Sequence, residues 1–559
     1  MVKSLLPLPK LRLLNLEGLV NVRFKSLTPL LFLVFASQMV AQQNVLLVIA
    51  DDLGTDYCGF YEDAKDTANM PQVRSLLGRG VRFTNAWSNP NCSPTRAGML
   101  TGRYSFRTGV GTAISGPEYN ELDTSEITIG KLLKNAAAPV TYATANIGKW
   151  HLNQQTQQSL IYPNLMGYDH YSGNFLGELP DYFEWKKVVD GAGPVTVTNY
   201  ATTETVDDAI QWLDEVDGSQ PFFLWLAFNA PHTPFHLPPD SLHTVPGLTG
   251  TQMHINQNPK AYFRAMTEAM DTELGRLLQH LDQQGQLDST NIIFIGDNGN
   301  LKRVSQIPDT TQGKGTIYEY GVHVPFIVAG PAVASPGRVS EALVSTPDLF
   351  ATILEMAGFD NWPAQIPASK PVDSRSLMPI LKYESQAIRD WNFTEQFSPQ
   401  PDPDDGKAIR NLAYKLLHFD DGHQEFYHLA TDPGEQSDLL PQLLSIEAAS
   451  NYGYLCNELS LLAGTDACDP AITSTETTSH DGSPALFPNP TGKVFFVKTK
   501  AASFQPLEIT VFDMLGRQSA NFYGNGPLLQ VDISDLTTGR YFVKIQQGES
   551  VWWNGVVKN

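Results

Sequence analysis

The chain of 559 residues has the composition of a folded protein, with 42% hydrophobic and 17% charged residues, which excludes wholesale disorder. Its 38 Lys and Arg residues face 59 Asp and Glu residues, for a formal net charge of −21. This balance argues against a nucleic-acid partner, because phosphate binding needs a basic surface. The length exceeds that of one typical domain, so we expect several.

Residues 1–41 have the pattern of a signal peptide. Five basic residues precede the apolar run at 30–36, and small residues such as Ala36 and Ala41 follow it. The run is too short to span a bilayer and is typical of a signal-peptide core. We therefore expect an exported protein.

Residues 42–389 predict an α/β domain. Apolar runs of strand length occur at 45–50, 221–228, 292–296 and 324–329, and residues 261–283 carry apolar side chains at helical spacing. Near-continuous apolar strands with intervening helices indicate a large sheet covered by helices on both faces.

The C-terminal part predicts two smaller units. Residues 390–468 contain strand patterns at 414–419 and 425–429 and suggest a smaller α+β subdomain, in which Cys456 and Cys468 are a candidate disulfide pair. Residues 469–484 are rich in Thr, Ser, Asp, Gly and Pro and predict a linker. Residues 485–559 contain five short strand patterns and predict a small all-β sandwich.

Two pairs of oxygen-bearing side chains follow predicted strands. Asp51 and Asp52 come directly after the run at 45–50, and Asp297 and Asn298 come directly after the run at 292–296. One such pair is usually a helix cap or a turn. Two pairs at strand ends favour a site for a hard cation, Ca²⁺ or Mg²⁺, since ligands of α/β sheets bind at the carboxyl ends of the strands.

Cys92 is the second chemical signal. It lies in a predicted polar loop with Pro94 and Arg96, and such an arginine can lower a thiol pKa or bind an oxyanion. For an isolated cysteine the ordinary interpretation is a half-buried structural residue.

The segment CSPTR at 92–96, followed by LTGR at 100–103, resembles the signature of the formylglycine-dependent, arylsulfatase-like sulfatases of the alkaline-phosphatase superfamily. Further matching segments are GKWHL at 148–152, APHTP at 230–234, KGTIYE at 314–319, and YHL at 427–429 with DPGE at 432–435. Their order and spacing fit as well, which makes the resemblance far more specific than one motif. Tyr320, His323 and His428 depart from the family pattern.

The resemblance implies a fold, a reaction and a set of roles. The fold would be alkaline-phosphatase-like, and Cys92 would be converted to formylglycine (3-oxoalanine) by a formylglycine-generating enzyme. The hydrated group would attack the sulfur of a sulfated small molecule or saccharide. A Ca²⁺ ion, or Mg²⁺, would be bound by residue 92 and by Asp51, Asp52, Asp297 and Asn298. The remaining roles are Lys149 and Lys314 as sulfate clamps, His232 as general acid, His151 as base, and Arg96 orienting the formylglycine.

The C-terminal residues resemble the sorting domain of type IX secretion cargo, through PNP at 488–490 and D.LGR at 513–517. This resemblance implies passage through the periplasm of a Gram-negative bacterium to the cell surface or the medium. The alternative is a generic β-sandwich or carbohydrate-binding module.

Two competing functions remain open at this point. A phosphonate monoester hydrolase or phosphodiesterase of the same superfamily can also use formylglycine, although GKWHL and KGT favour sulfate esters. The other competitor is an inactive surface glycan-binding protein, which the presence of every expected polar residue disfavours.

Overall fold

The computed structural model describes residues 43–464 except 157, 217 and 219, and residues 484–558 except 488–490, 492, 499–505, 514–516, 525–527 and 549. The predicted signal peptide at 1–41, the linker residues 469–483 and the PNP motif lie outside the described residues.

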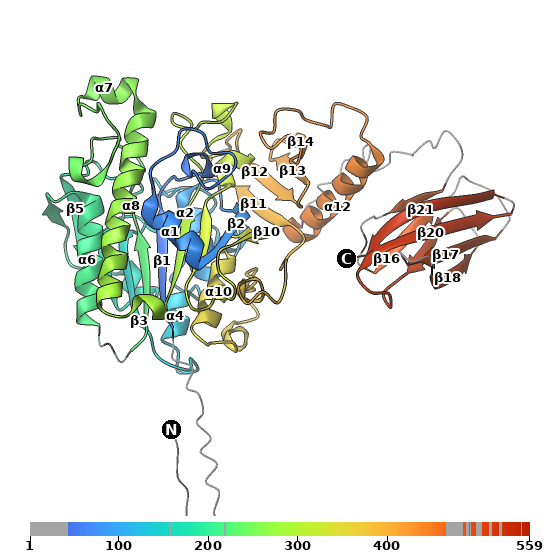
Figure 1. Ribbon diagram of the computed structural model, residues 1–559, viewed down its shortest axis with the longest axis horizontal. Coiled ribbons are helices and arrows are strands. Elements are labelled where there is room, and N and C mark those ends of the chain that lie inside the picture. Colours follow the sequence, from blue (N-terminus) through green and yellow to red (C-terminus); the bar gives the residue numbers. More distant parts are fainter. Residues whose placement is uncertain are drawn as a thin grey trace, which may run out of the picture. The chain divides into compact units, whose positions relative to one another are not determined.

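A mixed sheet of ten strands forms the centre of the larger part of the chain (Figure 1). In order across the sheet, the strands are β10 (Arg338–Ser345), β2 (Gly80–Trp87), β9 (Phe326–Ala329), β8 (Thr290–Gly296), β1 (Asn44–Ala50), β7 (Phe222–Ala227), β3 (Ala143–Lys149), β4 (His170–Asn174), β5 (Trp185–Val189) and β6 (Val195–Val197). Strand β1 pairs in parallel with both β8 and β7, while β9 runs antiparallel to its neighbours β2 and β8. The carboxyl ends of β8, β1, β7 and β3 therefore meet at one edge.

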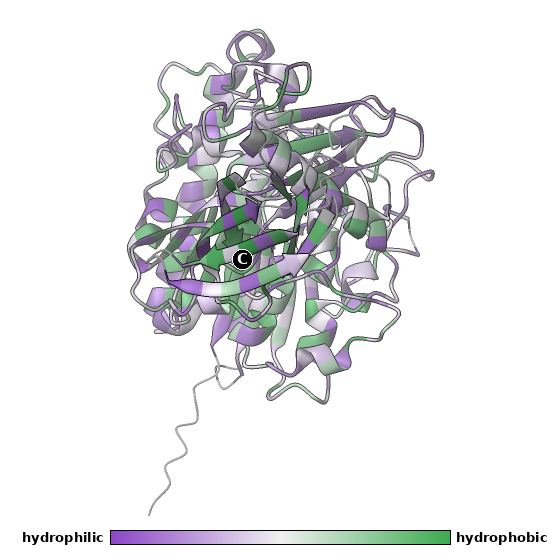
Figure 2. Ribbon diagram, turned by 90° about the vertical axis from the view of Figure 1, so that its right-hand side faces the viewer, coloured by the Kyte–Doolittle hydropathy of each residue, from purple (hydrophilic) through white to green (hydrophobic). Residues whose placement is uncertain are grey.

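Alternate residues of β1 enter two hydrophobic cores, one on each face of the sheet. Val45, Leu47 and Ile49 pack with α2 (Cys92–Thr101), α4 (Ile129–Leu133), α10 (Asp348–Met356) and α11 (Met378–Leu381). Leu46 and Val48 pack with α1 (Pro71–Arg79), α6 (Ala201–Glu215) and α8 (Pro259–Gln283). In Figure 2, hydrophobic residues run along many of the strands, and hydrophilic residues occupy many of the loops. The predicted α/β class, with helices on both faces of a large sheet, is confirmed.

The predicted helix at 261–283 is α8, which begins two residues earlier at Pro259. Proline suits this position because the first turn of a helix makes no use of its N–H. The predicted strand at 324–329 begins only at Phe326, since Pro325 cannot donate a ladder hydrogen bond.

The prediction that Cys92 lies in a loop is wrong. Cys92 is the first residue of α2 and is 1% exposed. Pro94 lies within the first turn of this helix, where its missing N–H costs nothing, and Gly102 ends the helix in the left-handed conformation. The Ser and Pro residues that suggested a loop are compatible with a helix start.

A second, antiparallel sheet contains β11 (Asn392–Gln396), β12 (Gly406–Arg410), β13 (Tyr414–Phe419) and β14 (Gln424–His428). The helix α12 (Ile446–Ala463) packs on it through a separate hydrophobic core. Of the three positions that depart from the family pattern, His323 and His428 have defined contacts. The ring of His323 contacts the Thr84 carbonyl at 2.9 Å, and His428 packs on Tyr414 with 4.5 Å between ring centroids.

The described tail contains two small antiparallel sheets. One consists of β15 (Ala485–Phe487), β16 (Val494–Lys498) and β19 (Leu528–Asp532), and the other of β18 (Gln518–Gly524), β17 (Leu507–Phe512), β20 (Gly539–Gln547) and β21 (Ser550–Lys558). Their inward residues form one core made only of tail residues. The expected all-β fold is confirmed, and β15 and β18 join the five predicted strands.

Cys58 and Cys92 are free thiols, whereas Cys456 is disulfide-bonded. Its predicted partner, Cys468, lies outside the described residues. In the part of the chain that the structure describes, no helix combines the length and apolarity needed to cross a membrane.

Candidate active site

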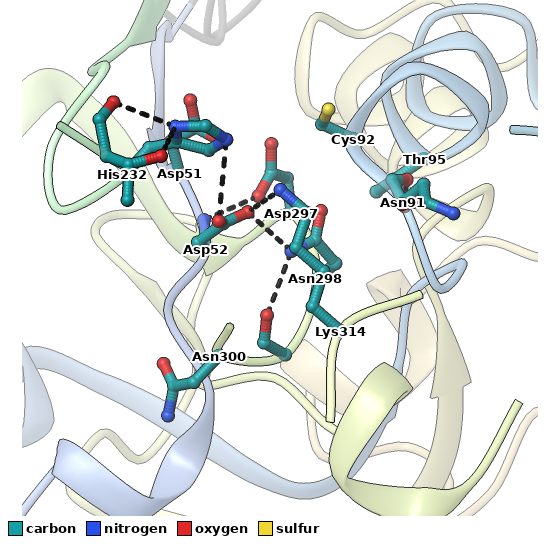
Figure 3. A network of polar contacts seen from close by, with 12 residues as sticks. Asp51, Asp52, Asn91, Cys92, Thr95, His232, Asp297, Asn298, Asn300 and Lys314 are labelled. Carbon is teal, nitrogen blue, oxygen red and sulfur yellow. Dashed lines mark hydrogen bonds and ion pairs between the residues drawn. The ribbon is translucent and has the colours of Figure 1, made fainter. Parts of the chain in front are cut away.

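The ten residues predicted from sequence for the site lie at the carboxyl edge of the large sheet or on helix α2. Asp51 and Asp52 follow β1, Lys149 ends β3, His232 lies after β7, and Asp297 and Asn298 follow β8. His151 comes two residues after β3, Cys92 and Arg96 lie on α2, and Lys314 lies in the loop before α9 (Glu319–Val322). The sheet therefore brings together residues that are far apart in the chain, as Figure 3 shows for seven of the ten.

Asp52 is the centre of the polar contacts (Figure 3). Its carboxylate accepts hydrogen bonds from Lys314 Nζ and from Asn298 Nδ2, the latter at 2.8 Å, and its backbone N–H donates to Asp297 Oδ1 at 2.9 Å. Burial alone would raise the pKa of Asp52, but His232 and Lys314 outweigh it and lower the pKa to about 2. Asp52 is therefore ionised.

Asp51 and Asp297 are each held by a buried cation. Lys149 Nζ donates to Asp51 Oδ2 at 2.5 Å, and Arg96 donates to Asp297 Oδ2 from Nε at 3.1 Å and from Nη2 at 2.8 Å. Arg96 also donates to the Lys149 carbonyl at 2.9 Å. Burial raises the pKa of Asp51 well above its ordinary value, against the opposing effect of Lys149. Despite burial, Arg96 lowers the pKa of Asp297.

Three buried oxygens of this cluster have no hydrogen-bond partner among the described residues: Asp51 Oδ1, Asp52 Oδ2 and Asn298 Oδ1. Buried acceptors without a partner are costly, so three in one cluster indicate a missing cationic group. Ligand atoms of Asp51, Cys92 and Asp297 also lie within 4.8 Å of one another, as do those of Asp51, Asp52 and His232. Carboxylate and amide oxygens are the donors that Ca²⁺ and Mg²⁺ prefer, so the residues fit such an ion.

Cys92 Sγ lies 3.0 Å from His151 Nδ1. The other ring nitrogen, Nε2, lies 3.1 Å from the Ile114 carbonyl, which can only accept, so Nε2 carries the proton. Burial and the charge of Lys149 lower the pKa of His151 well below its ordinary value. His151 is therefore a neutral ring whose Nδ1 lone pair faces the side chain at position 92.

His232 has the opposite arrangement. Its Nδ1 donates to the Thr233 carbonyl at 3.0 Å, and its Nε2 lies 3.5 Å from Asp52 Oδ2. Burial, together with the charges of Lys314 and Lys149, lowers the pKa of His232 to about 3. Its Nε2 is thus the nitrogen that can exchange a proton inside the site.

Some supporting residues were not predicted from the sequence. Tyr182 donates from its hydroxyl to the His232 carbonyl at 2.8 Å, and Gly177 lies against the His151 ring so closely that a Cβ there would be 2.5 Å from Cε1. Asn91 donates to Gln396 Oε1 on β11 at 2.7 Å. These contacts depend on the path of loops, for which the sequence carries no periodic signal.

Fold and site together define a hydrolase of the alkaline-phosphatase-like class. The profile described as "Sulfatase" matches residues 43–359, and the profile "N-sulphoglucosamine sulphohydrolase, C-terminal" matches residues 312–450. Since the first match covers more than half of the chain, the protein belongs to the sulfatase family and is a sulfuric ester hydrolase.

Several relatives with curated names are sulfatases. The chain is 27% identical to mouse steryl-sulfatase over 61% of its own length and 65% of the relative's, and 25% identical to human N-acetylgalactosamine-6-sulfatase over 71% and 81%. The solved structure of Ps i-CgsB in complex with k-i-k-neocarrahexaose is similar at a TM-score of 0.63 and 25% identity, covering 76% of this chain and 94% of that one. PsFucS1 sulfatase from Pseudoalteromonas sp., at a TM-score of 0.59, 22% identity, and 77% and 92% coverage, shares the fold.

The tail matches a second family. The profile "Secretion system C-terminal sorting domain" covers residues 485–559. This match indicates that type IX secretion delivers the chain to the cell surface or the exterior, as the sequence resemblance predicted.

Proposed function

We propose that the protein releases sulfate from sulfated carbohydrates outside the cell, using a formylglycine made from Cys92 and a Ca²⁺ ion at the Asp51 cluster. The observation that carries this proposal is the convergence of three unpartnered oxygens, from Asp51, Asp52 and Asn298, beside Cys92. The names of similar proteins, an N-acetylgalactosamine-6-sulfatase and a protein solved with a neocarrahexaose, support a carbohydrate substrate.

Asp51, Asp52, Asp297 and Asn298 would hold the cation. When bound, Ca²⁺ neutralises these carboxylates, makes a nearby hydroxyl more acidic and attracts a sulfate oxygen. When present and hydrated, formylglycine at position 92 carries two hydroxyl groups. One supplies the nucleophile for sulfur, and the other can lose a proton so that sulfate can leave.

The two lysines would bind the sulfate oxygens. Lys149 and Lys314 now donate to Asp51 and Asp52. A cation among these carboxylates would weaken those ion pairs and leave both ammonium groups available to an anionic ester. Arg96 would hold Asp297 in place through its two hydrogen bonds to Oδ2.

The two histidines would transfer protons at different atoms, one at position 92 and the other at the departing alcohol oxygen. His151 presents an unprotonated Nδ1 to position 92 and would accept a proton there. His232 presents Nε2 to the site. The negative charge of an entering sulfate ester favours its protonated form, which would then donate to the departing alcohol oxygen.

The test combines activity with mass spectrometry. Enzyme produced together with a formylglycine-generating enzyme should release sulfate from a panel of sulfated saccharides and should hydrolyse p-nitrophenyl sulfate much faster than a phosphodiester. The peptide containing residue 92 should carry formylglycine, and Cys92→Ala should be inactive. Full turnover by protein with only unmodified Cys92, or a preference for phosphodiesters, would contradict the proposal.

A further inference from the structure

The loop between β4 and β5, residues 175–184, borders both histidines of the site. It contacts the His151 ring through Gly177, and the Tyr182 hydroxyl shares its one hydrogen between the carbonyls of Asn229 at 2.6 Å and His232 at 2.8 Å. Strand β4 runs parallel to β3, so this loop lies at the same sheet edge as Lys149 and Asp51. Under the proposed function it flanks the side of the site where His232 meets the leaving group.

Near its end the loop carries an exposed aromatic ring, Phe183, which packs on neighbouring rings. Phe183 is 40% exposed, stacks on Tyr200 with 5.1 Å between centroids, and meets His236 edge-on at 5.7 Å. His236 Nδ1 donates to the Pro234 carbonyl at 2.9 Å, so its Nε2 accepts from the Tyr200 hydroxyl at 3.0 Å. Burial lowers the pKa of His236 to about 4, which keeps the ring neutral in this arrangement.

The same group of rings also contacts the backbone of the proposed general acid, His232. The Tyr182 ring lies 4.1 Å from His236, and the Tyr182 hydroxyl holds the His232 backbone. The exposed Phe183 ring and His232 are thus anchored to one cluster of packed rings. An aromatic face carries partial negative charge and attracts the slightly positive C–H groups of a flat, uncharged surface such as one face of a sugar ring.

The charged side chains of the loop are all acidic. Residues 175–184 include Glu178, Asp181 and Glu184 and no lysine or arginine. Glu178 lies close enough to Tyr182, and Asp181 to His236, to interact with them electrostatically, so both carboxylates would repel a sulfate group held beside these rings.

We propose that Phe183 is a specificity-determining residue, on which an unsulfated sugar ring adjacent to the sulfated one stacks. The inference rests on the proposed function and narrows it: the substrate is a saccharide in which a sulfated sugar is linked to an uncharged neighbour. Glu178 and Asp181 disfavour the same saccharide with a sulfated neighbour.

The test compares Phe183→Ala with Tyr383→Ala. Tyr383 is an exposed ring, 57% exposed, that packs against Arg338 at the start of β10 and therefore at the opposite edge of the sheet. The substrates are galactose 4-sulfate and N-acetylgalactosamine 6-sulfate, each as the monosaccharide, linked to an unsulfated sugar, and linked to a sulfated sugar.

For Phe183→Ala we expect the ratio of disaccharide KM to monosaccharide KM to rise about tenfold when the neighbour is unsulfated. Phe183→Trp should restore it, and Tyr383→Ala should leave it unchanged. Glu178→Gln combined with Asp181→Asn should lower the KM for the disaccharides with a sulfated neighbour.

The outcomes separate the two proposals. An unchanged KM ratio in Phe183→Ala, or the same change in Tyr383→Ala, would overturn the stacking role while wild-type sulfate release stands. An unchanged KM in the carboxylate variant would overturn the selection against sulfated neighbours. If the wild-type enzyme releases no sulfate from these saccharides or from the wider panel of sulfated saccharides, the proposed function fails, and this inference with it.

Discussion

Glu319 and Arg410, separated by 91 positions in the chain, form an ion pair of 2.7 Å whose side chains are only 8% and 5% exposed. Lys415 and Glu435 complete the cluster, with 2.8 Å between them. Glu319 begins α9, directly after the loop that carries Lys314. Arg410 and Lys415 belong to strands β12 and β13 of the sheet β11–β14. Through these ion pairs, the sheet β11–β14 helps to fix the position of the loop that carries Lys314.

Arg410→Ala should therefore cost stability as well as activity. It leaves Glu319 buried and without its closest partner, for which we expect a loss of about 3–5 kcal/mol in the free energy of unfolding. Lys407→Ala is the matched control on the same strand, because its pair with Asp420 is partly exposed and should contribute less than about 1 kcal/mol. Denaturant titration measures both, and equal losses would contradict the prediction.

Calcium should stabilise the folded protein before any reaction takes place. Free Ca²⁺ at about 100 times its Kd should add about 2.7 kcal/mol to the unfolding free energy, visible as a rise in Tm over chelator-treated protein. Asp51→Asn should abolish most of that rise, since it removes one ligand charge. Asp240→Asn, an exposed aspartate in the 3-10 helix Asp240–Leu242, should preserve it. The same calcium-induced rise in wild type and Asp51→Asn would argue against the metal site.

Glu395 should make stability fall as the pH rises. This residue of β11 accepts from Phe106 N at 2.7 Å, but its Oε2 is buried without a partner among the described residues, and burial raises its pKa to about 7. The folded state therefore keeps a proton that the unfolded chain loses near pH 4.5. Its stabilising contribution is complete below that pH and is lost as the pH rises to about 7, by about 3 kcal/mol.

Unfolding titrations of wild type and Glu395→Gln across this range measure the effect. The glutamine variant should lose less stability between pH 4.5 and 7.5, because it carries no proton to release. Parallel stability curves for the two proteins would show that Glu395 is ionised in the folded state at low pH.

Removing residues 485–559 should separate export from chemistry. The described tail residues form their own core, so the truncated enzyme should keep the kcat and KM of the full chain in recombinant form. In its native host it should no longer reach the cell surface or the exterior, which fractionation with immunodetection can follow. Normal delivery of the truncated chain would refute the sorting role of the tail.

The strands buried on both faces were predictable from sequence because their apolar runs are nearly continuous. Strand β3 was not predicted, since Thr144 and Asn146 are polar yet completely buried. The closeness of the Asp51 and Asp297 pairs could be inferred because each follows a strand, and strand ends of one direction meet at one edge. The helical position of Cys92 and the contact of Tyr182 with His232 could not, since neither produces a periodic pattern. The domain boundaries and the roles of the site residues stay predictions.

The first described strand of the chain is also a central strand of the sheet. β1 lies between β7 and β8, and Asp52 meets Asp297 from 245 positions further along the chain. During synthesis, the site therefore cannot form until most of the domain has left the ribosome. Cys92 is 1% exposed once that has happened, and Arg96 is completely buried. An enzyme that recognises Cys92 together with its neighbouring residues can therefore act only until β8 and the later strands have completed the sheet.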